Sequence, residues 1–205
     1  MKEPLIKNRV RLDFMRSESL RVGGWSPELR TYLRKHRINL EDCSAHAGYF
    51  NVALVKFWTG NDGDRAFTFD PEGQPAAIIE ALLFDKDREP FVADLVAWPI
   101  NHPLAFVTAL GLNDGADVLG PQHMVRRAGV PLVLHRTPLA WLQAGCQGCV
   151  PLKPGARHWL HRAGGPFITD SVEHGLELRE LLDLIGPQTR RHEILVPTGA
   201  RRAAA

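Results

Sequence analysis

Residues 129–197 alternate short apolar runs with stretches of helical character, and this alternation constrains the fold more than any other feature of the chain. The apolar run 130–134 is long enough for a buried strand and too short for a helix. Thr137 provides an N-cap oxygen, and Pro138 suits the first helical position, where its missing N–H costs nothing. Strands that alternate with helices at this spacing predict right-handed βαβ units around a mainly parallel sheet. The expected strands are 130–134, 149–152, 167–169 and 193–197, and the expected helices are 139–144, 156–163 and 171–185.

Residues 49–98 show a different pattern, which is typical of antiparallel hairpins. Their first ten residues are mostly of the β-branched and aromatic types that favour a half-buried sheet surface. Glycine, asparagine and aspartate then mark the turns between successive apolar runs. One of these runs, 76–84, also fits a helix, but the neighbouring hairpin favours a strand. We therefore expect an antiparallel meander with strands at 49–58, 66–69, 76–84 and 91–98.

The N-terminal segment and the two connecting segments have weaker patterns. Val10, Leu12 and Phe14 alternate with charged residues, which predicts an edge strand with one buried face. Ser26 and Pro27 then open a short helix with a largely basic surface. After the hairpins, two more short helices are expected at 104–110 and 122–128.

Together these patterns predict an α+β protein, in which an N-terminal helix and antiparallel hairpins pack with a C-terminal α/β unit. The expected parts are an N-terminal region of residues 1–120, a C-terminal region of residues 121–198 and a flexible tail of residues 199–205. A length of 205 residues with 44% hydrophobic and 23% charged residues is ordinary for a soluble globular protein. No apolar run is long enough to span a bilayer, and three cysteines, an odd number in a chain this long, argue against a secreted disulfide scaffold. We therefore expect a cytoplasmic protein without a membrane partner.

The net charge of +2 is distributed unevenly along the chain. Residues 1–37 carry ten lysines and arginines against four acids, and residues 38–120 carry four against thirteen. The remainder is basic again, with eleven against six. This distribution is compatible with basic surfaces that bind nucleic acid, but it favours charges scattered over a solvated surface.

Two turns in the C-terminal region carry the residues that suggest a family. The first is His135-Arg136-Thr137-Pro138-Leu139-Ala140-Trp141, and the second is Asp170-Ser171-Val172-Glu173-His174-Gly175. Their order along the chain resembles that of the Toprim domain, the α/β module of primases, type IA and type II topoisomerases and related nucleases. That family has a glutamate in the first turn and Asp-x-Asp-x-x-Gly in the second. The final Val196-Pro197-Thr198-Gly199 is similar to the family's Pro-x-Gly turn, so the resemblance covers the last third of the chain.

The resemblance implies a divalent-metal site, but this chain departs from it at the metal ligands. His135 stands where the family has its glutamate and Val172 where it has its second aspartate, so only Asp170 and Gly175 match. Because Mg²⁺ needs several hard oxygen ligands, we expect a degenerate Toprim-like unit in which Asp170-Ser171 begins a helix. The alternative is a metal-dependent phosphodiester enzyme, nuclease-like or primase-like, that uses Asp170, Glu173 and His135 with Mg²⁺ or Mn²⁺.

A Cys-x-x-His pair and a Cys-x-x-Cys pair offer soft ligands of the kind that Zn²⁺ accepts. The first is Cys43 with His46, and the second is Cys146 with Cys149. The pairs lie about a hundred residues apart, and the Cys-x-x-Cys follows a predicted helix rather than opening one, as a redox pair normally does. Buried structural thiols are the expected role, with zinc binding and redox chemistry as the alternatives.

The function predicted from these features is non-catalytic nucleic-acid-associated binding, with DNA, RNA or a replication or nuclease protein as partner and no cofactor. By association with Toprim relatives, the context is the replication machinery of a phage, plasmid or other mobile element. The alternatives are the metal-dependent enzyme, an acidic inhibitor that mimics DNA through its middle region, and a structural component defined by its assembly. The candidate nucleic-acid contacts are Arg9, Arg11, Arg34, Lys35, Arg136, Arg157 and Arg162.

Overall fold

The computed structural model describes residues 3–22, 26–43, 47–60, 63–112, 114–127, 129–183 and 194–196. The chain divides into two compact units, Met1–Ala116 and Asp117–Ala205, here named the N-terminal unit and the C-terminal unit. The division falls after Ala116, whereas the sequence pattern placed it after residue 120. The tail expected at 199–205 lies outside the described residues.

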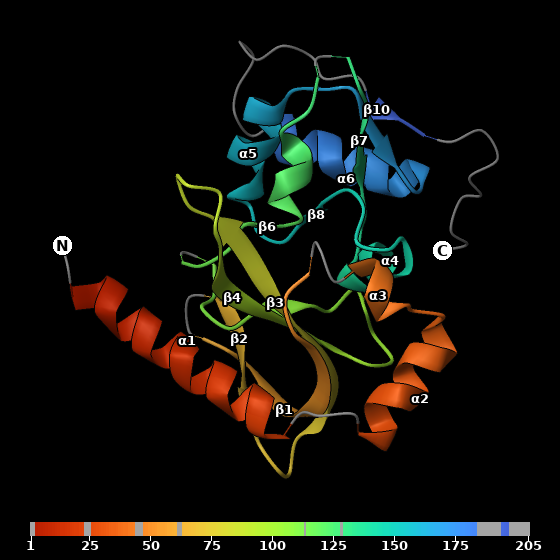
Figure 1. Ribbon diagram of the computed structural model, residues 1–205. Coiled ribbons are helices and arrows are strands. Elements are labelled where there is room, and N and C mark those ends of the chain that lie inside the picture. Colours follow the sequence, from red (N-terminus) through yellow and green to blue (C-terminus); the bar gives the residue numbers. More distant parts are fainter. Residues whose placement is uncertain are drawn as a thin grey trace. The chain divides into compact units, whose positions relative to one another are not determined.

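The N-terminal unit consists of helices and one five-stranded antiparallel sheet, as predicted for an α+β protein (Figure 1). The sheet has the strand order β2-β1-β3-β4-β5, and both predicted hairpins, β1–β2 and β3–β4, are present. The expected meander is wrong in one respect, because β3 pairs with β1 and not with β2. The elements are α1 Glu3–Val22, α2 Pro27–His36, α3 Leu40–Cys43, β1 Phe50–Thr59, β2 Arg65–Phe69, β3 Gln74–Phe84, β4 Pro90–Pro99 and β5 Val107–Thr108.

Helix α1 replaces the strand that the sequence pattern predicted near the N-terminus. The alternation of Val10, Leu12 and Phe14 is coincidental, since Val10 and Phe14 are 65% and 66% exposed. The buried positions are Leu12, Met15 and Ser19, which recur with the spacing of one helical face. Burial of this face against the sheet therefore decides the local structure.

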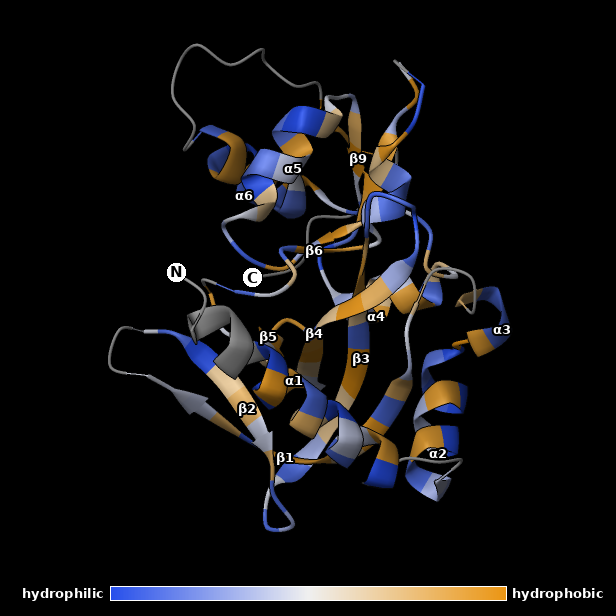
Figure 2. Cartoon of the chain, turned by 60° about the vertical axis from the view of Figure 1, so that its left-hand side comes forward, coloured by the Kyte–Doolittle hydropathy of each residue, from blue (hydrophilic) through white to orange (hydrophobic). Residues whose placement is uncertain are grey.

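The sheet lies between α1 and α2, with a separate apolar layer on each side (Figures 1 and 2). On one side, Leu12 and Met15 of α1 join a cluster that includes Val55 and Phe67 of the sheet. On the other side, the buried Tyr32 of α2 accepts a hydrogen bond of 2.9 Å from the indole N–H of Trp98 in β4. The predicted cap of α2 is present, with the Leu29 N–H donating to Ser26 Oγ at 3.0 Å.

Residues 104–110 form turns and β5 rather than the predicted helix. The backbone is held there by strand pairing to β4 and by the buried carboxylate of Asp94, which accepts from Leu110 N at 3.1 Å. Gly115 approaches the same carboxylate with a φ of 79°, and a Cβ at this position would lie 2.1 Å from Asp94 Oδ2. These long-range contacts outweigh the helical spacing of the apolar residues.

The C-terminal unit contains the predicted parallel sheet, with the strand order β10-β9-β7. The strand expected at 149–152 is not part of this sheet, because β8 pairs antiparallel with β6 in a second, two-stranded sheet. The helix expected at 122–128 is only one 3₁₀ turn, η1, which ends at Met124. The elements are β6 Val118–Leu119, η1 Pro121–Met124, β7 Leu132–Leu134, α4 Pro138–Gln143, β8 Val150–Pro151, α5 Ala156–Ala163, β9 Phe167–Thr169, α6 Val172–Asp183 and β10 Ile194–Leu195.

The sequence explains where the C-terminal helices begin. Thr137 Oγ1 accepts from Ala140 N at 3.0 Å, and Ser171 Oγ accepts from His174 N at 3.1 Å, so both predicted caps are present. Leu134, Leu160 and Phe167 form the centre of the apolar core between the parallel strands and the helices. Among the helices of the described residues, none has the length and apolar character needed to cross a bilayer.

Candidate functional site

The carboxyl edge of the parallel sheet brings together polar residues from the two turns that suggested the family. Leu134 of β7 is paired with Thr169 of β9 in the parallel register. The residues that follow, His135 and Asp170, therefore leave the same edge of the sheet side by side. Open α/β sheets place their ligand sites at this edge, which makes it the first candidate for function.

His135 is buried, and a backbone carbonyl fixes which of its ring nitrogens carries the proton. Its Nε2 lies 2.8 Å from Gln147 O, and because a carbonyl oxygen only accepts, the proton resides on Nε2 and leaves Nδ1 as an acceptor. Burial lowers the pKa of His135, and the Gln147 carbonyl and the Asp170 charge oppose this effect only in part. His135 is therefore a neutral hydrogen-bonding group at neutral pH.

Asp170 is paired with a histidine that the sequence interpretation had left without a partner. His174 Nδ1 donates to Asp170 Oδ1 at 2.7 Å across one turn at the start of α6. Burial raises the pKa of Asp170, but the His174 hydrogen bond, the His174 charge and backbone N–H groups, including that of Arg136, together bring this pKa below its ordinary value. Asp170 is thus a carboxylate that holds an imidazole and the start of a helix in place.

The burial of neutral His135 predicts that the C-terminal unit loses stability in mild acid. Its pKa is lowered in the folded state, so the unfolded chain binds the proton first as the pH falls below the ordinary histidine value of about 6.5. The free energy of unfolding should therefore decrease as the pH falls from that value to the lowered pKa. His135→Gln keeps a neutral donor towards Gln147 and should flatten this part of the profile.

Urea unfolding of the protein and the variant between pH 7.5 and 5 measures the difference. His158→Gln removes an exposed histidine from α5 and serves as the control. A wild-type slope that His135→Gln leaves unchanged would contradict the assignment.

Arg136 lies at the predicted edge of the parallel sheet, but its side chain forms an ion pair with Glu177. Its Nε donates to Glu177 Oε2 at 2.9 Å, and its Nη2 also contacts Glu177 Oε1. This two-point contact fixes the guanidinium on α6 and neutralises most of its charge. Arg136 is consequently a weaker candidate for a phosphate contact than the exposed arginines elsewhere.

The metal-dependent alternatives are not supported by the arrangement of the described residues. No group of three histidine, cysteine or acidic side chains in the described residues is placed to hold a metal ion, so Glu173 does not complete a site with Asp170 and His135. His46 lies outside the described residues. Cys43, Cys146 and Cys149 are buried and form no disulfide, and Cys149 donates to Gly120 O at 2.9 Å. Burial raises the pKa of Cys149 to about 12, which fits a structural thiol.

Exposed cations gather on α2 and α5. Helix α2 buries Leu29, Tyr32 and Leu33 and turns its basic residues to solvent. Helix α5 buries Ala156 and Leu160, and it contains no acidic residue. The exposed basic residues of the two surfaces are Arg30, Arg34, Lys35 and Arg37 at α2 and Arg162 on α5, where Arg157 is half-buried.

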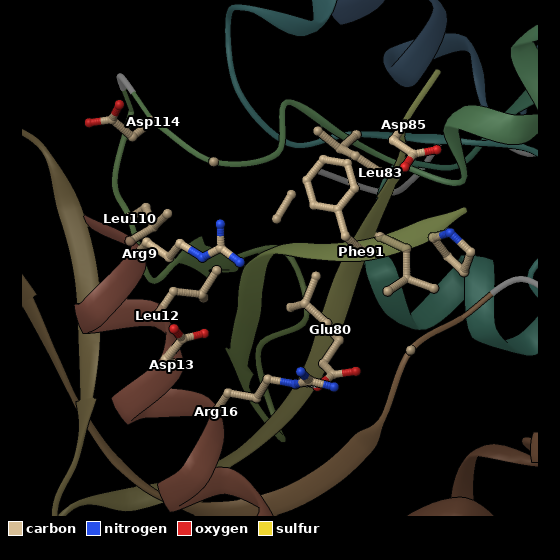
Figure 3. A pocket seen from close by; sticks show the side chains of 16 residues that line it. Arg9, Leu12, Asp13, Arg16, Glu80, Leu83, Asp85, Phe91, Leu110 and Asp114 are labelled. Atoms are coloured by element: carbon tan, nitrogen blue, oxygen red, sulfur yellow. Dashed lines mark hydrogen bonds and ion pairs between the residues drawn. The ribbon is translucent and has the colours of Figure 1, made fainter. Parts of the chain in front are cut away.

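The two predicted contacts on α1 differ from each other. The Arg11 guanidinium carbon lies 5.8 Å from the centre of the Trp58 ring, which is a cation–π contact. Arg11 is therefore held against Trp58 rather than directed at solvent. Arg9 lines an open hollow of the N-terminal unit (Figure 3).

The sequence interpretation did not assign His174 and Glu177 to the site. Their positions on the helix that follows Asp170 were the signal that could have identified them.

Comparison with known proteins does not assign a family or a function to these residues. A scan against protein-family models finds no match. Searches among curated proteins and among solved structures find no match either. The interpretation of function therefore rests on the residues and contacts described above.

Proposed function

We propose that the protein is a non-catalytic nucleic-acid-associated binding protein that contacts the phosphate backbone of DNA or RNA. The observation that supports this best is the contrast between paired and unpaired cations. Arg16, Arg21 and Arg136 each contact a glutamate. The exposed cations of α2 make no ion pair with any described residue, so their charge is available to an external anion.

The proposal extends to the origin of the C-terminal unit, which we infer to be a degenerate Toprim-like module. It is supported by the parallel pairing of β7 and β9 and by the common edge from which His135 and Asp170 emerge. The side chains at this edge bind neighbouring protein groups rather than a shared ion. His135 bonds to Gln147, Asp170 to His174 and Arg136 to Glu177. A replication context in a phage, plasmid or other mobile element follows by association with Toprim proteins.

The acidic middle region is less suited to mimic DNA, because many of its carboxylates bind within the fold. Asp64 accepts from Leu112 N at 2.8 Å. Asp85 accepts from Glu89 N at 2.9 Å in the β3–β4 turn. Acids that fold the loops in this way are not presented as a regular row of phosphate-like charges.

Salt-dependent binding tests the proposal. The probes are fluorescein-labelled 20-nucleotide single-stranded DNA, its duplex and the matching RNA, with anisotropy measured between 50 and 200 mM NaCl. We expect Arg30→Gln/Arg34→Gln/Lys35→Gln to reduce the salt slope by about one for each cation that contacts a phosphate, and to weaken binding across sequences. Arg157→Gln/Arg162→Gln tests the α5 surface in the same way.

The control removes cations that are already paired. Arg21→Gln/Arg136→Gln takes away two positive charges, and should change the affinity less than either helix variant does. Because basic residues near a helix C-terminus also stabilise the helix, thermal unfolding of every variant is recorded. Absence of wild-type binding to all three probes at 50 mM salt would refute the proposal, as would equal losses in the control and the helix variants.

A further inference from the structure

Trp159 on α5 differs from the tryptophans that build the cores of the two units. Trp98 and Trp141 are 0% and 1% exposed, and their indole N–H groups donate to acceptors inside the fold. Trp159 is 38% exposed, and its indole N–H donates to Asp117 Oδ2 at 3.3 Å. Tryptophan is highly buried on average, so an exposed ring whose polar atom is held in place is a candidate for contact with another molecule.

The bond to Asp117 holds the Trp159 ring against the beginning of α5. Asp117 is half-buried beside Gly155, the residue that precedes the helix, and a Cβ at Gly155 would lie 2.3 Å from Asp117 Oδ1. The carboxylate therefore lies at the positive end of the α5 dipole, which offsets its negative charge. The backbone of Asp117 is held as well, because Leu152 N donates to its carbonyl oxygen at 2.8 Å. The fold thus fixes the indole N–H and leaves part of the ring surface in solvent.

A cation lies next to this ring on the same helix. Arg162 is exposed and follows Trp159 by three positions, so the two side chains are neighbours on the helix surface. Arg162 forms no ion pair within the part of the chain that the structure describes. Arg126 donates to two carbonyls at the C-terminal end of α5, at 3.2 and 2.5 Å, and so places a further positive charge there. An exposed ring beside a guanidinium matches an unpaired base beside its phosphate.

We propose that the α5 surface binds single-stranded nucleic acid, with one unpaired base stacked on the Trp159 ring and a neighbouring phosphate held by Arg162. This inference rests on the nucleic-acid binding proposed above and adds the form of nucleic acid that the α5 surface takes. The bases of a duplex are stacked on one another, whereas each base of a single strand offers a free π face. The contact selects single strands without reading their sequence, because stacking tolerates every base.

Comparison of a normal strand with an abasic strand separates base stacking from phosphate contacts. The probes are fluorescein-labelled 12-nucleotide oligothymidylate and a strand of 12 abasic tetrahydrofuran units, which has the same phosphates and no bases. At 50 mM NaCl the protein should bind oligothymidylate about tenfold more tightly than the abasic strand, as one stacked base provides. Trp159→Leu keeps an apolar side chain without a π face, and should bring this ratio to about one without weakening the abasic strand. Trp159→Phe should retain most of the ratio.

Trp58→Leu is the matched control, because Trp58 is 39% exposed but lies on β1 with Arg11 against its ring, and it should leave the ratio unchanged. Equal affinity of the unaltered protein for the two strands, while both bind, would overturn the inference and leave the phosphate contacts of the proposed function intact. A ratio that persists in Trp159→Leu, or is lost in Trp58→Leu, would also overturn it. Absence of binding to either strand would instead refute the proposed function on which the inference rests. Thermal unfolding of each variant is recorded, and the comparison of the two strands on the unaltered protein stands whatever the stability of the variants.

Discussion

Arg16→Ala is expected to destabilise the N-terminal unit by about 2 to 3 kcal/mol, because it leaves a carboxylate buried without its cation. The side chain of Glu80 is 6% exposed, and Arg16 Nε meets its Oε1 at 2.5 Å. The other oxygen of Glu80 accepts from Tyr49 N at 2.9 Å, so some compensation remains after the substitution. Arg16 itself is 45% exposed, which keeps the effect below that of a fully buried pair.

The same helix offers a matched control for this experiment. Arg21 pairs with Glu18 one turn away, but the Arg21 side chain is 70% exposed. Arg21→Ala should therefore cost at most about 0.5 kcal/mol, as surface pairs within a helix do. Urea unfolding with hydrogen exchange at β1 and β3 amides measures both variants. Arg16→Leu/Glu80→Leu should recover part of the loss, since an apolar pair avoids the cost of desolvation but leaves Tyr49 N without its acceptor. Equal losses in Arg16→Ala and Arg21→Ala would show that Glu80 does not need its partner.

Phe167→Ala is expected to destabilise the C-terminal unit by about 3 to 5 kcal/mol, the usual cost of emptying a buried aromatic site. The ring of Phe167 is fully buried and packs in one cluster with Leu132, Leu160 and Leu178. Its backbone also joins the two parallel pairings, to Leu132 of β7 and to Ile194 of β10. The cavity would therefore open at the centre of the sheet, where the neighbours cannot easily collapse.

Loss of amide protection in β7, β9 and α6 reports this effect separately from global unfolding. Phe167→Leu retains most of the apolar volume and should cost clearly less. Leu176→Ala removes an exposed leucine from α6 and should change the stability little. If Phe167→Ala left protection in β7 and β9 unchanged, the proposed position of this ring at the core would be wrong.

The C-terminal elements could be predicted from the sequence because their boundaries are encoded locally. Thr137 and Ser171 cap the helices that follow them, and short apolar runs between such caps leave room only for strands. The sheet edge could be predicted too, since parallel strands place His135 and Asp170 together once β7 and β9 are neighbours. What stayed out of reach was the pairing of side chains across that edge, such as Arg136 with Glu177.

The errors in the N-terminal unit have a common physical cause, which is that distant contacts decide local structure. Leu12 and Phe14 have similar apolar character, and only packing on the sheet buries the first and exposes the second. Likewise Val107 joins a strand because Ala97 offers a pairing edge. The Arg16–Glu80 pair and the hollow beside it bring together residues 64 positions apart, a separation that no periodic pattern reveals.

The buried thiols have a practical consequence for spectroscopy. All three cysteines of the chain are sequestered, and Cys149 remains protonated at neutral pH because its pKa is raised to about 12. Maleimide dyes react with accessible thiolates, so the native protein offers them a low background. An introduced cysteine at an exposed position such as Leu176 would then take up a single fluorophore without replacement of the natural cysteines.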